Sequence, residues 1–258
     1  MVFNIRDIDD TQAPLLDHLI ELRARLMRCI FALLLAFGVC AYFAQDILGF
    51  LVQPLVHAGQ AKLIYTKLYG QFFVEMKVAL FAAFFVSFPI IANQLWAFVA
   101  PGLYAQEKKA FLPFLLATPI LFTCGGALAY YVVMPTAFHW FLGFQGKQGG
   151  LQIEALPNSE DYLGLVMQFI LAFGFCFLLP VLLLLLNRAG IVSRTMLVSA
   201  RRYVIVGITI VAAVITPPDV VSQLIVTIPL WLLFEISISI AARVNKEQEK
   251  DQVPSEWS

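Results

Sequence analysis

Long apolar runs limit the folds open to this chain more than any other feature of its sequence. Six such runs lie at about residues 29–44, 72–100, 110–133, 162–186, 203–215 and 220–242. About 20 helical residues cross the roughly 30 Å core of a bilayer, and a helix satisfies its own backbone hydrogen bonds there. With 60% hydrophobic and 13% charged residues, residues 1–258 are predicted to form one all-α, polytopic membrane domain of six transmembrane helices, without a soluble domain.

The distribution of Lys and Arg predicts how these six spans are oriented. One set of connecting segments is rich in cations: Arg6, Arg23, Arg25, Arg28, Lys108, Lys109, Arg188, Arg194, Arg201, Arg202, Arg243, Lys246 and Lys250. The other set holds Lys62, Lys67 and Lys147. Because cytoplasmic loops carry the excess of positive charge, both termini are expected in the cytoplasm. Residues 1–28 are then a cytoplasmic, interfacial segment, and residues 243–258 a polar, unstructured tail.

The fifth and sixth spans are predicted to be short. Residues 203–215 supply about 13 residues, or roughly 20 Å of helix, before the turn Thr216-Pro217-Pro218-Asp219. We therefore predict that these spans thin the bilayer. Glu235 lies in the sixth span, where a thin bilayer would hydrate its charge. Alternatively, Glu235 is protonated or paired with another helix.

The composition argues against catalysis and against bound cofactors. The sequence contains no G-x-S-x-G, H-E-x-x-H or phosphate-binding glycine loop. The thiols and imidazoles are scattered without metal-ligand spacing: Cys29, Cys40, Cys124, Cys176, His18, His57 and His139. The net charge of zero offers no field for nucleic acid. We expect neither an enzyme nor a cofactor, metal or nucleic-acid site.

Acidic side chains mark the first segment, where LLDHLIELRARLMR precedes the membrane. Leucines recur there at helical spacing, with Asp17 and Glu21 on the other side of the helix. Glu21 and Arg25 form a supporting i, i+4 pair. The acidic spot could receive a cation, or it could be the solvated face of an interfacial helix. Glu107, in the next loop on the same side, could join this spot or pair with Lys108, Lys109 or a helix N-terminus.

Five sequence blocks carry a family resemblance, and they occur in the order HLIELRARL, LWAFVAPGLYAQEKK, AFGFCFLLPV, RRYVIVG and ITPPDVVSQ. Together they resemble the TatC family, the receptor subunits of the twin-arginine protein translocase. The resemblance runs over nearly the whole chain. It implies a receptor and core scaffold in the bacterial cytoplasmic membrane that binds the signal peptides of folded precursor proteins.

The resemblance also implies which residues bind the paired arginines of the signal. The matching carboxylates are Glu21 and Glu107, which suits a guanidinium because it can fork onto a carboxylate. Further residues at family positions would shape or support that site: Arg23, Phe98, Pro101, Leu103 and Tyr104. The implied partners are TatA- and TatB-like single-span subunits, membrane lipid and further copies of the chain.

The outer turn between spans five and six is the predicted contact for a single-span partner. Thr216, Gln223 and Asp219 bring polar groups there, beside apolar residues such as Val214. The polar side chains could instead bond only to their own backbone.

Two residues depart from the family pattern. Leu178 stands before the span-four proline, where relatives often carry an acidic or amide residue, and Gly70 stands where many relatives have an acid before span two. Gln168 lies about 15 Å from Leu178 along a helix and cannot replace that group.

A second function remains open at the level of sequence. Glu235, Glu75 and Lys77 are ionisable residues in or beside the spans. Such residues are functional candidates in a membrane, so the alternative is a proton- or cation-coupled carrier of small solutes.

Overall fold

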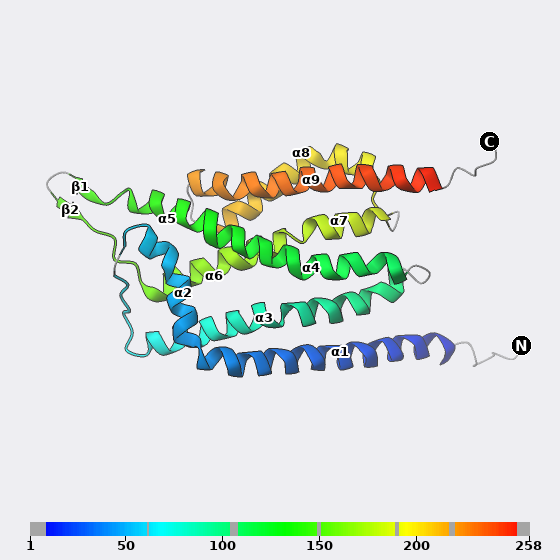
Figure 1. Ribbon diagram of the computed structural model, residues 1–258, viewed down its shortest axis with the longest axis horizontal. Helices are drawn as coiled ribbons and strands as arrows, with labels where there is room; N and C mark the ends of the chain where they lie inside the picture. The colour runs from blue at the N-terminus through cyan, green and yellow to red at the C-terminus, as the bar shows by residue number, and fades with distance from the viewer. Residues whose placement is uncertain are drawn as a thin grey trace, which may run out of the picture. The chain divides into compact units, whose positions relative to one another are not determined.

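The computed structural model describes residues 9–60, 62–103, 108–148, 151–188, 191–216 and 220–251 (Figure 1). The chain divides into two compact units. Unit 1 comprises Met1–Ile47 and Glu75–Pro119, and unit 2 comprises Leu48–Val74 and Ile120–Ser258.

Six helical segments of the described chain are long and apolar enough to cross a membrane. They are Leu19–Tyr42, Gly70–Phe98, Phe114–Leu142, Ser159–Asn187, Thr195–Val214 and Gln223–Ile240. The predicted all-α, six-span architecture is confirmed. The last two segments are also the shortest, with 20 and 18 residues against 24 to 29 in the others.

Unit 1 is built on the approach of two long helices, α1 (Asp9–Tyr42) and α3 (Gly70–Leu103). Ala36 and Cys40 of α1 cluster with Ala79 and Ala83 of α3 and with Ala44, where α2 (Ala44–His57) begins. Small side chains let membrane helices approach closely, so dispersion contacts and not a separate hydrophobic driving force hold them together. The first residues of α4 (Lys108–Leu128) complete the unit.

Unit 2 contains the remaining helices. After α4 come the π-helix η2 (Ala129–Val133), α5 (Met134–Leu142), α6 (Ser159–Cys176), α7 (Leu179–Arg188), α8 (Arg194–Ile215) and α9 (Val220–Asp251). Helix α9 lies alongside both α8 and α7 (Figure 1). Gly125 of α4 sits where a Cβ atom would lie 2.5 Å from the backbone oxygen of Phe173 in α6. Helix α6 therefore approaches α4 closely at this glycine.

Span four is two helices joined by a turn at Phe177 and Leu178. Pro180 is the second residue of α7, and proline has no N–H to continue the α-helical series of backbone hydrogen bonds. At the turn, the Leu178 amide donates to the Phe175 oxygen, three residues earlier, at 3.0 Å. The break in span four thus lies just before Pro180.

A cap of short elements closes one end of unit 2, at the left in Figure 1. It consists of α2, the loop 58–69, and a hairpin of β1 (Gly146–Gln148) and β2 (Leu151–Ile153), the one sheet in the described ranges. The Tyr162 hydroxyl donates to the Leu51 oxygen at 3.0 Å, and the Tyr130 hydroxyl donates to the Phe50 oxygen at 2.6 Å. These bonds hold α2 on the ends of the spans.

Two helices extend beyond the predicted boundaries. Helix α8 begins at Arg194 and not at residue 203, with the Ser193 hydroxyl accepting a hydrogen bond from the Met196 amide at 3.2 Å. Arg201 and Arg202 therefore lie on a helix and not in a loop. Helix α9 continues to Asp251, so the prediction of an unstructured tail from residue 243 was wrong for its first part.

Candidate functional site

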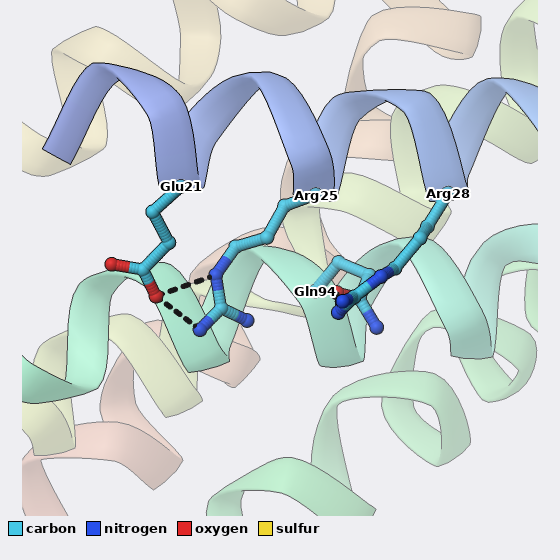
Figure 2. Close-up of polar contacts among 4 residues, drawn as sticks. All are labelled: Glu21, Arg25, Arg28 and Gln94. Atoms are coloured by element: carbon cyan, nitrogen blue, oxygen red, sulfur yellow. Dashed lines mark hydrogen bonds and ion pairs between the residues drawn. The ribbon is translucent and has the colours of Figure 1, made fainter. Parts of the chain in front are cut away.

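Glu21, one of the two predicted signal-binding carboxylates, pairs with Arg25 on the first part of α1 (Figure 2). The Arg25 Nε donates to Glu21 Oε1 at 3.0 Å, and Arg25 Nη2 donates to the same oxygen. The residues are four apart and share one face of the helix. The sequence prediction of this pair is confirmed.

The two side chains differ in exposure. Arg25 is 19% exposed, whereas Glu21 is 42% exposed. Both bonds from Arg25 converge on Oε1, and Oε2 of Glu21 points away from the guanidinium (Figure 2). Oε2 has no hydrogen-bond or ion-pair partner among the residues that the structure describes. The half-exposed Glu21 side chain is thus held by Arg25 through one of its two oxygens.

Two further polar contacts frame this part of unit 1. Arg28 of α1 donates to Gln94 of α3 through a long Nη1 to Oε1 hydrogen bond of 3.5 Å (Figure 2). The Trp96 indole of α3 donates to the Thr118 hydroxyl of α4 at 2.7 Å, and Thr118 is buried. Sequence reasoning missed the roles of Gln94 and Thr118. An amide and a hydroxyl inside apolar runs were the available signal.

The structure places only some of the other predicted site residues. Arg23 is exposed and Phe98 is half-buried. Pro101 and Leu103 lie in the last turn of α3, but their side chains are outside the described part of the chain. Tyr104 and Glu107, and the side chain of Asp17, also lie outside it.

The polar groups at the end of α8 bond to backbone. The Thr216 hydroxyl donates to the Ala212 oxygen at 2.9 Å, and the Gln223 side chain donates to the Thr209 oxygen at 3.1 Å. The Thr216 bond matches the alternative interpretation, in which such side chains bond to their own backbone, whereas the Gln223 bond joins α9 to α8. Val214 is 75% exposed. Asp219 lies outside the described residues.

Glu235 is paired with another helix, as the alternative interpretation of this residue allowed. Arg201 Nη2 of α8 lies 2.9 Å from Glu235 Oε2 of α9. An ion pair supplies the local countercharge that a carboxylate needs near a membrane interior. Hydration by a thinned bilayer is therefore not needed to explain this residue.

The remaining polar candidates differ in their exposure and local position. Gln168 and Lys77 are exposed, and Glu75 is half-buried. Leu178 occupies the turn between α6 and α7. Gly70 is the first residue of α3, where its amide donates to the Lys67 oxygen at 2.9 Å.

Residues 17–229 match the sequence model of the family described as Sec-independent protein translocase protein (TatC). The chain is 46% identical to the TatC protein of Magnetococcus marinus over 249 residues, which cover 96% of this chain and 90% of that one. It is 39% identical to the protein of the same name from Escherichia coli K12, over 90% of this chain and 88% of that one.

The fold is similar to a solved structure described as the crystal structure of the twin arginine translocase receptor TatC. The TM-score is 0.77 at 36% sequence identity, over 88% of this chain and 99% of the other.

Proposed function

Because the chain belongs to the TatC family of Sec-independent protein translocase proteins, we propose that it is the signal-peptide receptor and core scaffold of a twin-arginine translocase. It binds the paired arginines of a signal peptide and holds the precursor for export. The observation that carries this proposal is the half-exposed Glu21 side chain, whose Oε2 faces away from Arg25 and has no partner among the described residues (Figure 2).

Recognition of two arginines requires more negative charge than Glu21 supplies. Glu21 is surrounded along α1 by Arg23, Arg25 and Arg28. A second carboxylate is needed for the second guanidinium, and Glu107 is the family-matched residue in the loop after α3. In this proposal Phe98, Pro101, Leu103 and Tyr104 shape the apolar side of the site.

The proposal includes orientation and partners. Six spans return the chain to the side on which it starts, and the Lys and Arg bias supports a cytoplasmic position for that side in a bacterial inner membrane. TatA- and TatB-like single-span subunits would contact the exposed apolar side chains near the end of α8, such as Val214. Several copies of the chain would assemble in one receptor complex. No catalytic step and no cofactor are involved.

Exchange of the signal arginines for lysines is the test of this proposal. We expect the purified protein in lipid nanodiscs to bind a twin-arginine peptide about tenfold more tightly than its twin-lysine variant, since lysine cannot form the forked pair. Equal affinities would contradict recognition by the carboxylates.

Two possible roles of Arg25 predict opposite changes in peptide affinity when this residue is substituted. If Arg25 only adds positive charge, the substitution Arg25→Gln should strengthen the binding of a cationic peptide. Because Arg25 holds Glu21 through Oε1, we expect the opposite. Freeing a side chain costs about 0.5–1.5 kcal/mol, so peptide affinity should fall about twofold to tenfold. Calorimetry on Arg25→Gln, with Arg28→Gln as the exposed control on the same helix, measures the difference. A gain in affinity would show that Arg25 competes with the signal.

The described residues lend no support to the carrier alternative. Glu235, its central candidate, is engaged by Arg201 at 2.9 Å. Lys77 and Glu75 lie near the start of α3, and Glu235 lies on α9.

A further inference from the structure

The loop between α2 and α3 exposes an unusual concentration of apolar surface. Tyr65, Leu68 and Tyr69, which we call the apolar tip, are 59%, 97% and 59% exposed. Leu68 is the most exposed large apolar side chain in the described ranges. A fully solvated leucine is unfavourable by about 1.5–3 kcal/mol relative to a buried one, so an apolar environment is favoured here.

The base of this loop is held firmly, so the exposure does not come from a loose segment. The Gln60 side chain donates to the Ala155 oxygen at 2.7 Å. The Ile64 amide donates to the Pro157 oxygen at 3.1 Å, and the Ser159 amide donates to the Ile64 oxygen at 2.8 Å. The loop is thus bonded to the chain that leads into α6, and the apolar tip projects from a fixed base.

The apolar tip continues into an aromatic surface on the first turn of α3. Tyr69 contacts Phe73 edge to face, with ring centroids 5.6 Å apart, and Phe72 contacts Phe73 at the same distance. Phe72 and Phe73 are 59% and 52% exposed. An aromatic surface of Tyr69, Phe72 and Phe73 therefore extends from the loop onto the helix.

The first residues of spans two and four indicate the depth at which this surface meets the bilayer. The apolar segment of span two begins at Gly70, directly after the apolar tip, and that of span four begins at Ser159, which is bonded to Ile64. Tyrosine favours the membrane–water interface, because its ring is apolar and its hydroxyl is polar. Lys67 lies between the tip residues, is 57% exposed, and lies 4.0 Å from Glu160.

We propose that the apolar tip is a lipid-docking element that inserts into the headgroup region of the leaflet opposite the Glu21 side, with Lys67 against a lipid phosphate. A mixture of tyrosines, an aliphatic side chain and one cation matches the chemistry of that layer. The element joins the cap to the bilayer and holds the entries of α3 and α6 at one depth.

Site-specific labelling tests the proposal. The four native cysteines, Cys29, Cys40, Cys124 and Cys176, are replaced by alanine, and one cysteine is introduced as Leu68→Cys or, as the control in the same loop, Lys62→Cys. Each variant carries an environment-sensitive dye in vesicles of phosphatidylethanolamine and phosphatidylglycerol. We expect lipids spin-labelled near the headgroup to quench the dye at position 68 at least about threefold more than at position 62.

Equal quenching by aqueous iodide at both positions would overturn the proposal. So would shielding of position 68 that depends on a second copy or on a single-span subunit, because the surface would then be a protein interface. Hydroxyl-radical footprinting of the unaltered protein provides an independent measurement. Tyr65, Leu68 and Tyr69 should be at least about threefold less oxidised in vesicles than in a short-chain detergent, and unchanged oxidation would contradict lipid insertion.

Discussion

Replacement of both signal-binding carboxylates, Glu21→Ala with Glu107→Ala, is expected to abolish retention of a twin-arginine peptide at micromolar concentration. Truncating one partner of a desolvated charged pair costs about 2–5 kcal/mol, and an exposed pair contributes under about 1 kcal/mol. Glu21 is 42% exposed. We therefore expect about 1–2 kcal/mol for each carboxylate and about 2–4 kcal/mol together, or roughly 30-fold to 1,000-fold in affinity.

The matched control for this experiment is Glu235→Gln. Glu235 is also a carboxylate engaged by an arginine, but it belongs to the α8 and α9 pair and not to α1. Fluorescence anisotropy with a labelled peptide measures all three proteins in nanodiscs. Full peptide affinity in the double variant would remove Glu21 and Glu107 from the binding site.

Lengthening α8 by four leucines after Ile210 should impair export and leave peptide binding intact. Helix α8 has 22 residues, but Arg201 and Arg202 confine its apolar part to about 13 residues, or roughly 20 Å, short of the hydrocarbon core of about 30 Å. The insertion adds about 6 Å. A difference between span length and bilayer thickness costs a fraction of a kcal/mol per Å, so the insertion should lower the cost of deforming the bilayer by about 1–3 kcal/mol. If export depends on a thinned bilayer, it should slow about tenfold.

A substitution series without a change in length is the control for the insertion. It replaces exposed apolar side chains of α8 by leucine, namely Ile205, Val206, Ile210 and Val214. Transport of a folded reporter into inverted membrane vesicles measures both proteins. Normal export by the lengthened protein, with its inserted turn shown to lie in the membrane, would exclude thinning from the mechanism.

Local periodicity explains why much of the fold could be predicted from the sequence. Each span depends on its own run of apolar residues, and the Glu21 and Arg25 pair depends only on helical spacing. Neither feature needs knowledge of which helices are neighbours.

The errors at helix ends have a different cause. The charge of Arg201 and Arg202 predicts a connecting segment, because charge is costly in a membrane. The segment RTMLVSARR nevertheless contains good helix formers, and Ser193 caps the helix. The segment VNKEQEKD is also rich in helix formers, which explains why α9 continues to Asp251. The high polarity of these segments indicates that they lie outside the membrane. It does not indicate that the helix ends at the membrane surface.

Contacts between helices could not be predicted, because they depend on register. The pairing of Arg201 with Glu235 joins residues 34 positions apart. The sequence shows both charged residues, but it does not show that they pair. Gln94 and Thr118 were likewise visible only as polar residues in apolar runs. The anchoring of the cap through Gln60 and Ile64 depends equally on distant segments.

Photo-crosslinking of a twin-arginine signal peptide tests the receptor function most directly. A photoreactive amino acid is placed at position 21, 98 or 107, with position 42, at the opposite end of α1 and 84% exposed, as the control. The receptor function predicts peptide adducts at 21, 98 and 107 that disappear with a twin-lysine peptide, and none at 42. Adducts of equal yield at all four positions, or adducts that persist with the twin-lysine peptide, would contradict it.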